Sequence, residues 1–145
     1  MMKKEFEALA GYEVSFEDYS NIIEPMYMAI GASKQEFVKM LDKKRFALPT
    51  KTQLIKQMKQ IAEHLKETCG RYTDYKAKDE LDAIAREYAR RFHGIDWVKD
   101  TDTYVIFTTE YEFPTIGRGC TYPKVLHIGK GYREVEKIQL VKEVQ

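Results

Sequence analysis

Residues 81–113 read LDAIAREYARRFHGIDWVKDTDTYVIFTTEYEF, and the spacing of the apolar residues changes within this stretch at Gly94. Before Gly94 the apolar residues recur every three or four positions, which buries one stripe of a helix. After Gly94 they alternate with polar residues, which buries one face of a strand. The stretch therefore predicts helices first and a small antiparallel sheet last, which is an α+β fold.

The first two predicted helices begin at serines that can cap them. One begins at Ser15 and reaches a C-terminal cap at Gly31. It passes through Pro25, which either kinks this helix or opens a second short one, and the unbroken apolar pattern favours the kink. The other begins at Ser33, which forms a capping box with Glu36. Its last turn is predicted to hold three cations: Lys43, Lys44 and Arg45.

The next two helices are predicted to form an antiparallel hairpin. The third begins at Thr50 or Thr52 and stops at Gly70, and the fourth runs from about Asp74 to Phe92. The link between them is short, as is typical of helical hairpins. Each of the two helices carries an apolar stripe, and the two stripes together form one face that the hairpin can bury.

The end of the chain is predicted to form a three-stranded antiparallel meander. A first strand covers residues 104–113, and a loop follows over residues 114–123. A hairpin then turns at Gly129-Lys130-Gly131. Such a small sheet needs a helical layer on one face to be stable.

Length and composition are those of one globular domain. The chain has 145 residues, of which 43% are hydrophobic and 32% are charged, and this length buries enough surface for one core. We therefore expect one α+β domain over residues 1–145, with helices at 15–93 packed on a meander at 103–142. No apolar run is long enough to span a membrane or to form a signal peptide. The protein is therefore predicted to be cytoplasmic, without a membrane partner.

No residue pattern points to a metal or a cofactor. The cysteines and histidines match no zinc-binding spacing, and the glycines match no phosphate-binding loop. In a reducing compartment Cys69 and Cys120 are expected as free thiols, although the sequence also allows a disulfide between them. A thiol enzyme would use Cys120, activated by Arg118, with His127 as the base across the hairpin. No carboxylate is indicated to orient that histidine.

Positive charge gathers in the helical middle of a chain whose net charge is +1. Residues 34–93 carry fifteen Lys or Arg and nine acids, whereas residues 1–33 carry two lysines and six acids. This distribution excludes an acidic mimic of DNA. Cations beside aromatic rings contact phosphates and stack on bases. The candidate binding residues, on the meander and on the third and fourth helices, are Arg118, Tyr111, Phe113, Tyr122, Lys124, Lys56, Lys59, Lys66, Arg86, Arg90 and Arg91.

The composition also suits a protein partner. The chain has ten tyrosines and six methionines, which protein interfaces favour in their cores. The apolar stripe on the first predicted helix is wider than one helix face needs, so part of it either meets a partner or fills the core. This stripe consists of Met26, Tyr27, Met28 and Ile30.

The segments Ser15-Phe16-Glu17-Asp18-Tyr19 and Ile22-Ile23-Glu24-Pro25-Met26-Tyr27 resemble the opening helix of small uncharacterised accessory proteins from phages and mobile elements of Firmicutes. The resemblance covers only the start of the chain and includes no catalytic residue. It implies an accessory protein that binds host or phage machinery. Inhibitors of bacterial defence nucleases belong to that class.

We therefore expect a non-catalytic interaction module that binds or inhibits a host protein or nucleoprotein, such as a defence nuclease. Direct binding of nucleic acid is the alternative. A small thiol enzyme that uses Cys120 is the third interpretation. The sequence does not predict the oligomeric state.

Overall fold

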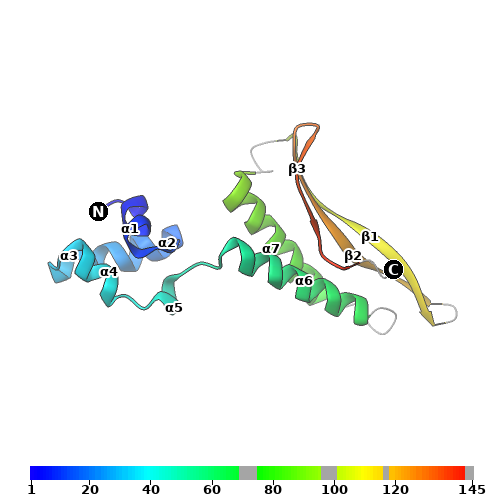
Figure 1. Ribbon diagram of the computed structural model, residues 1–145, viewed down its shortest axis with the longest axis horizontal. Helices are drawn as coiled ribbons and strands as arrows, with labels where there is room; N and C mark the ends of the chain where they lie inside the picture. Colours follow the sequence, from blue (N-terminus) through cyan, green and yellow to red (C-terminus); the bar gives the residue numbers. More distant parts are fainter. Residues whose placement is uncertain (69–74, 96–100, 116–117, 143–145) are drawn as a thin grey trace. The chain divides into compact units, whose positions relative to one another are not determined.

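Helices precede a three-stranded antiparallel sheet in the computed structural model of this chain (Figure 1). The structure describes residues 1–68, 75–95, 101–115 and 118–142. The predicted α+β fold class is confirmed. The chain divides into two compact units, Met1–Pro49 and Thr50–Gln145. Each unit has its own cluster of buried apolar side chains, where the sequence predicted one core.

The N-terminal unit is built from short helical segments around an aromatic core. They are α1 (Lys3–Ala10), α2 (Phe16–Asp18), the π-helical η1 (Tyr19–Ile23), α3 (Glu24–Ile30), α4 (Lys34–Met40) and α5 (Lys43–Phe46). The ring centroid of Phe6 lies 5.9 Å from that of Tyr19 and 6.4 Å from that of Phe37. Helix α1 was not predicted, because Phe6 is its one buried residue and acids surround it.

One uninterrupted helical run consists of α2, η1 and α3. Ser15 caps it by accepting a hydrogen bond from the backbone amide of Asp18 at 3.1 Å. As predicted, the run passes through Pro25. The π-helical turn lies directly before the proline, and the amide of Glu24 donates to the carbonyl of Tyr19. Proline has no amide hydrogen, so it cannot donate the next backbone hydrogen bond of a regular α-helix. The wider π-helical turn lies at the position where that bond is missing.

The predicted apolar stripe of this run is divided between core and surface. Met26 and Tyr27 pack against the buried cluster of the N-terminal unit. Met28 and Ile30 are 73% and 44% exposed. The stripe is therefore wider than the core requires, and its outer half faces solvent.

The second predicted helix is shorter than expected. Ser33 caps α4 by accepting from the amide of Glu36 at 3.2 Å, as predicted. Among the described residues the Glu36 side chain does not bond back to Ser33, so the predicted capping box is half formed. The helix ends at Met40, so residues 43–45 do not form its last turn. They belong to α5, which the side chain of Asp42 caps. An aspartate that bonds to the backbone just ahead of it ends one helix and begins the next.

The C-terminal unit packs two helices against one face of the sheet (Figure 1). They are α6 (Lys51–Glu67) and α7 (Tyr75–His93), and they form the predicted antiparallel hairpin. A reciprocal capping box begins α6: the amide of Gln53 donates to Thr50 Oγ1 at 3.2 Å, and the amide of Thr50 donates to Gln53 Oε1 at 2.8 Å. Gly94 follows α7 with a φ of 63°, which suits its predicted role as a cap. Gly70, the predicted end of α6, lies outside the described residues.

The sheet is the predicted meander, with strand order β1-β2-β3. Its strands are β1 (Thr103–Thr115), β2 (Arg118–Lys130) and β3 (Arg133–Gln139). The predicted loop over residues 114–123 is wrong, because most of that segment is strand. The prediction failed at Pro123. This proline lies in the central strand beside a register shift at Thr108 and Thr109, and such an irregularity tolerates a residue without an amide.

The core of the C-terminal unit lies between the helices and the sheet. Leu126 and Ile128 of β2 are fully buried, as are Met58 of α6 and Tyr88 of α7. Residues that point away from this core, on α6 and after β3, remain available to form a surface site.

Candidate functional site

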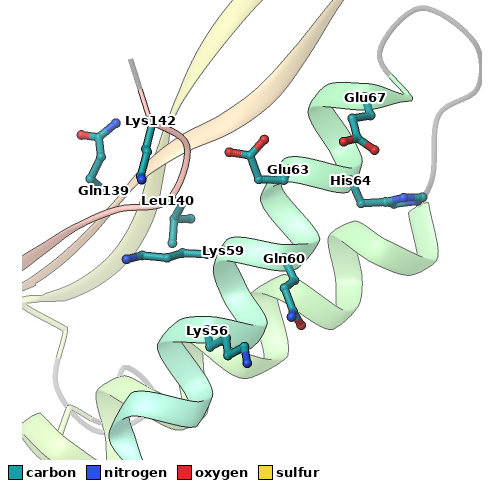
Figure 2. Close-up of a pocket in the computed structure, with 9 residues that line it drawn as sticks. All are labelled: Lys56, Lys59, Gln60, Glu63, His64, Glu67, Gln139, Leu140 and Lys142. Carbon is teal, nitrogen blue, oxygen red and sulfur yellow. The ribbon is translucent and has the colours of Figure 1, made fainter. Parts of the chain in front are cut away.

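A groove of about 690 Å³ lies between α6 and the end of β3 (Figure 2). We call it the α6–β3 groove. Its lining residues are Lys56, Lys59, Gln60, Glu63, His64 and Glu67 of α6, together with Gln139, Leu140 and Lys142. Two of the predicted binding residues, Lys56 and Lys59, therefore line a concave surface.

Helix α6 turns its charged side chains to the groove because its apolar stripe faces the core. Met58 and Leu65 are 0% and 5% exposed. Lys59 and Glu63, one helical turn apart, lie on the solvent side. Figure 2 shows both of them on the side of α6 that faces Leu140. The helical period of α6 thus builds one wall of the groove.

Hydrogen bonds fix the other wall. The amides of Leu140 and Val141 donate to the carbonyl of Lys124 at 2.8 and 3.2 Å. Gln139 Nε2 donates to the carbonyl of Val141 at 2.6 Å. Leu140 is buried and Lys142 is exposed. The wall therefore offers an apolar base with a cation at its rim.

The α6–β3 groove carries charges of both signs. Lys56, Lys59 and Lys142 make no ion pair within the described part of the chain. Glu63 and Glu67 line the same groove. A nucleic-acid backbone presents only negative charge, so it would meet two carboxylates here. A protein surface with acidic and basic groups matches the groove better, because complementary charges set the register of a partner.

The predicted arginines of α7 are mostly engaged within their own helix. Arg86 Nε pairs with Asp82 Oδ2 at 2.8 Å, and Arg91 Nη1 pairs with Glu87 Oε1 at 3.7 Å. Arg90 is exposed. Ion pairs of this kind on a helix surface hold the side chains along the helix. None of these three arginines lines the α6–β3 groove.

Three of the predicted residues lie against other side chains beside the bulge in β2. Tyr122 is 6% exposed, and Lys66 Nζ lies 5.6 Å from its ring centroid. Lys124 Nζ donates to Glu110 Oε1 at 3.0 Å. Tyr122 is therefore part of the core of this unit rather than a free stacking platform.

Among the predicted aromatic residues of the meander whose side chains the structure describes, Tyr111 is exposed and Tyr122 is buried. Tyr111 is 57% exposed, and its ring lies so close to Gly119 that a Cβ there would be 1.9 Å from Tyr111 Oη. The glycine thus leaves room for the ring on the neighbouring strand. The side chains of Phe113 and Arg118 lie outside the described residues. The predicted combination of Arg118 with aromatic rings stays a prediction.

Cys120 is disulfide-bonded in the structure. The expected free thiol is therefore absent at this position. The other cysteine of the sequence, Cys69, lies outside the described residues. A thiol enzyme needs a thiolate nucleophile, so a disulfide-bonded Cys120 cannot serve that role.

A partly buried polar cluster between α7 and β3 was not predicted. Tyr88 Oη donates to Glu136 Oε1 at 2.6 Å, and His93 Nε2 lies 2.7 Å from the same oxygen. Burial acts to raise the pKa of Glu136, but the hydrogen bonds from Tyr88 and His93 bring it below its ordinary value. Burial and the bond to Glu136 together raise the pKa of Tyr88. One sequence signal was present: Glu136 lies two positions from the buried Ile138, and therefore on the same face of β3.

A second cluster connects all three strands of the sheet. Thr108 Oγ1 lies 2.6 Å from His127 Nε2, and His127 Nδ1 hydrogen-bonds to Glu134 Oε1. No carboxylate was predicted beside His127, and Glu134 occupies that place. The hydrogen bonds connect a hydroxyl to an imidazole and the imidazole to a carboxylate, which is the order found in the catalytic triads of hydrolases. Catalysis also needs a substrate site and oxyanion donors, and these residues do not line the α6–β3 groove. The contacts that the structure describes for this cluster are those of a hydrogen-bond network across the strands.

No family model, no curated protein and no solved structure matches this chain. Among the described residues, no three His, Cys, Asp or Glu side chains gather where they could hold a metal ion. The helices of the described ranges are also too short or too polar to cross a membrane. Among the described residues of the C-terminal unit, the α6–β3 groove is the site that brings predicted binding residues together in a concave surface.

Proposed function

We propose that the protein is a non-catalytic interaction module that binds or inhibits a host protein or nucleoprotein through the α6–β3 groove. The observation that carries this proposal is that Lys56, Lys59 and Lys142 line one groove together with the buried Leu140. None of the three lysines has an ion-pair partner in the described ranges. The resemblance of the segments Ser15–Tyr19 and Ile22–Tyr27 to phage accessory proteins supports the same class, which includes inhibitors of defence nucleases.

Direct binding of nucleic acid is the second candidate, favoured by the same three lysines. Each lysine that contacts a phosphate releases counterions and makes the affinity depend on salt. Glu63 and Glu67 oppose this interpretation because they would repel a phosphate backbone from the same groove. A protein partner therefore ranks first. The thiol enzyme is no longer favoured, because Cys120 is disulfide-bonded. The cytoplasmic location stays a prediction.

Charge reversal in the groove tests the proposal. We expect the double variant Lys56→Glu, Lys59→Glu to lose a protein that the wild-type chain retains from a bacterial lysate. The matched control is Lys130→Glu, Lys137→Glu, which makes the same charge change at two exposed positions of the sheet. The control is expected to retain that protein. Affinity capture followed by mass spectrometry measures the difference, and circular dichroism verifies that all three chains are folded.

The same variants separate the two candidate functions. If wild type, groove variant and control retain the same proteins, the α6–β3 groove is not the binding surface. A DNA mobility shift that weakens steeply with salt, and that only the groove variant loses, would establish the nucleic-acid interpretation instead.

A further inference from the structure

A second groove, of about 350 Å³, lies between α1 and α4 in the N-terminal unit. We call it the α1–α4 groove. Leu9 of α1 forms one apolar wall, and Val38 and Leu41 form the other. Leu9 is 42% exposed. The walls therefore present aliphatic surface to solvent within a concave site of the size that takes one or two side chains of a partner.

The charges of this groove have one sign. Lys39 and Lys43 line it, and no acidic side chain does. Neither lysine forms an ion pair within the residues that the structure describes. Lys39 and Lys43 therefore attract carboxylates. Asp42, whose charge acts on Tyr12 of this groove, is exposed and does not line it, whereas Glu63 and Glu67 line the α6–β3 groove.

Tyr12 lines the same groove and carries a buried hydroxyl without a hydrogen-bond partner in the described chain. An acceptor in a bound partner can reach this hydroxyl only if the Tyr12 side chain shifts toward the groove. Lys43 Nζ lies 6.0 Å from the ring centroid. Burial, together with the charge of Asp42, raises the pKa of Tyr12, so the hydroxyl keeps its proton. A buried donor without an acceptor is unfavourable, and a bound acceptor would remove that cost.

We propose that the α1–α4 groove binds an acidic segment of a partner protein that inserts an apolar side chain between Leu9 and Val38. Carboxylates of the segment lie at Lys39 and Lys43, and a carbonyl or carboxylate oxygen accepts from Tyr12 Oη. The aliphatic walls match the side chain of a leucine or phenylalanine. The two lysines beside them match acidic residues that flank that side chain in the sequence of the partner. This site belongs to a different unit from the α6–β3 groove and does not depend on the function proposed for it.

A labelled peptide tests the inference on the full chain. The probe is a fluorescein-labelled peptide in which glutamates flank leucine and phenylalanine, measured by fluorescence polarisation. We expect saturable binding, and a loss of affinity of roughly tenfold or more in Lys39→Glu, Lys43→Glu, because reversed charges face the peptide's carboxylates. The matched control Lys4→Glu, Lys44→Glu changes two exposed lysines of the same unit. It is expected to bind as the wild type does.

Two further measurements separate this site from general charge attraction. A peptide with serine in place of leucine and phenylalanine is expected not to bind, because it leaves the apolar walls empty. In Tyr12→Phe the affinity should fall about fivefold, while the free protein melts at a higher temperature because its unpaired hydroxyl is gone. A merely structural tyrosine would give a lower melting temperature instead.

The inference fails if the acidic apolar peptide does not bind, if the serine peptide binds equally, or if the Lys39 and Lys43 reversal has no effect. Preference for a single-stranded oligonucleotide over the peptide would also overturn it. Reversal of Lys56 and Lys59 is expected to leave peptide binding unchanged. Failure of this site and failure of the α6–β3 groove are therefore distinguishable.

Discussion

The two units of the chain are stabilised in different ways and offer different surfaces. In the C-terminal unit two long helices pack on a sheet around aliphatic residues, and the α6–β3 groove carries both charges. In the N-terminal unit short helices surround aromatic rings, and the α1–α4 groove carries only cations. Lysines beside aliphatic residues occur in both grooves. The acids placed among them therefore decide which partner each groove suits.

Removing one aromatic ring from the core of the N-terminal unit is expected to cause the largest loss in the free energy of unfolding. Phe37 is fully buried, and its ring lies 5.1 Å from that of Tyr27. Phe37→Ala should lower the free energy of unfolding of the N-terminal unit by about 4 kcal/mol through the cavity that it leaves. Because the C-terminal core is separate, its amides should keep their protection in residue-resolved hydrogen exchange. Phe16→Ala, at a position 71% exposed, is the control without effect.

The reciprocal variant is Leu126→Ala in the C-terminal unit, where Leu126 is fully buried. Its loss should be of similar size, about 3 kcal/mol, and confined to residues after Thr50. If either variant removes protection from both units together, the chain unfolds as one cooperative domain, as the sequence predicted.

The next effect, in order of size, concerns the polar cluster that only the C-terminal unit has. Tyr88→Phe removes the donor to Glu136 and leaves a partly buried carboxylate with one fewer hydrogen bond. We expect a loss of about 2 kcal/mol, measured by urea unfolding at neutral pH. Tyr75→Phe, at a tyrosine 71% exposed, should change nothing. A loss equal in both variants would show that the hydrogen bond to Glu136 does not matter.

This cluster also predicts how stability depends on pH. The folded pKa of Glu136 is below its ordinary value of 4.5, so its contribution is complete above that pH and disappears as the pH falls through the folded pKa. The folded pKa of Tyr88 is above its ordinary value of 10.0. Its contribution is complete below that pH and disappears as the pH rises further. Tyr88→Phe should flatten the stability profile in both ranges.

The sequence predicted the parts of the fold that have long periodic patterns. Helices α6 and α7 and the meander follow from their apolar spacing, and Ser15, Ser33 and Thr50 form the caps expected of them. Helix α1 was missed because one buried phenylalanine shows no period. Pro123 was placed in a loop because a register shift between strands is not visible in a single strand.

The candidate site was predicted only in part, for a related reason. Lys56 and Lys59 lie three positions apart on one helix, so the sequence already places them on neighbouring parts of its surface. That Lys142 lines the same groove depends on how the chain after β3 bonds to Lys124, which is a contact between distant segments. Tyr12 in the α1–α4 groove was not predicted for the same reason. Its hydroxyl has no hydrogen-bond partner in the described chain because of how the whole N-terminal unit packs around it.

The smallest expected effect compares the caps that begin a helix in each unit. Ser33→Ala removes the acceptor for the Glu36 amide in α4, and Thr50→Ala removes the acceptor for the Gln53 amide in α6. Each should cost about 1 kcal/mol. The consequences should differ, because α4 has 7 residues and α6 has 17. A short helix has few bonds beyond its first turn, so the loss should spread along all of α4.

Hydrogen exchange of the individual amides measures this difference. We expect Ser33→Ala to lower protection along the whole of α4, and Thr50→Ala to lower it only in the first turn of α6. Ser33→Asp and Thr50→Asp keep an acceptor at each cap and should restore protection. Equal, local losses in both helices would mean that α4 is stabilised by the packing of Phe37 rather than by its cap. The two units would then rely on their cores to the same degree.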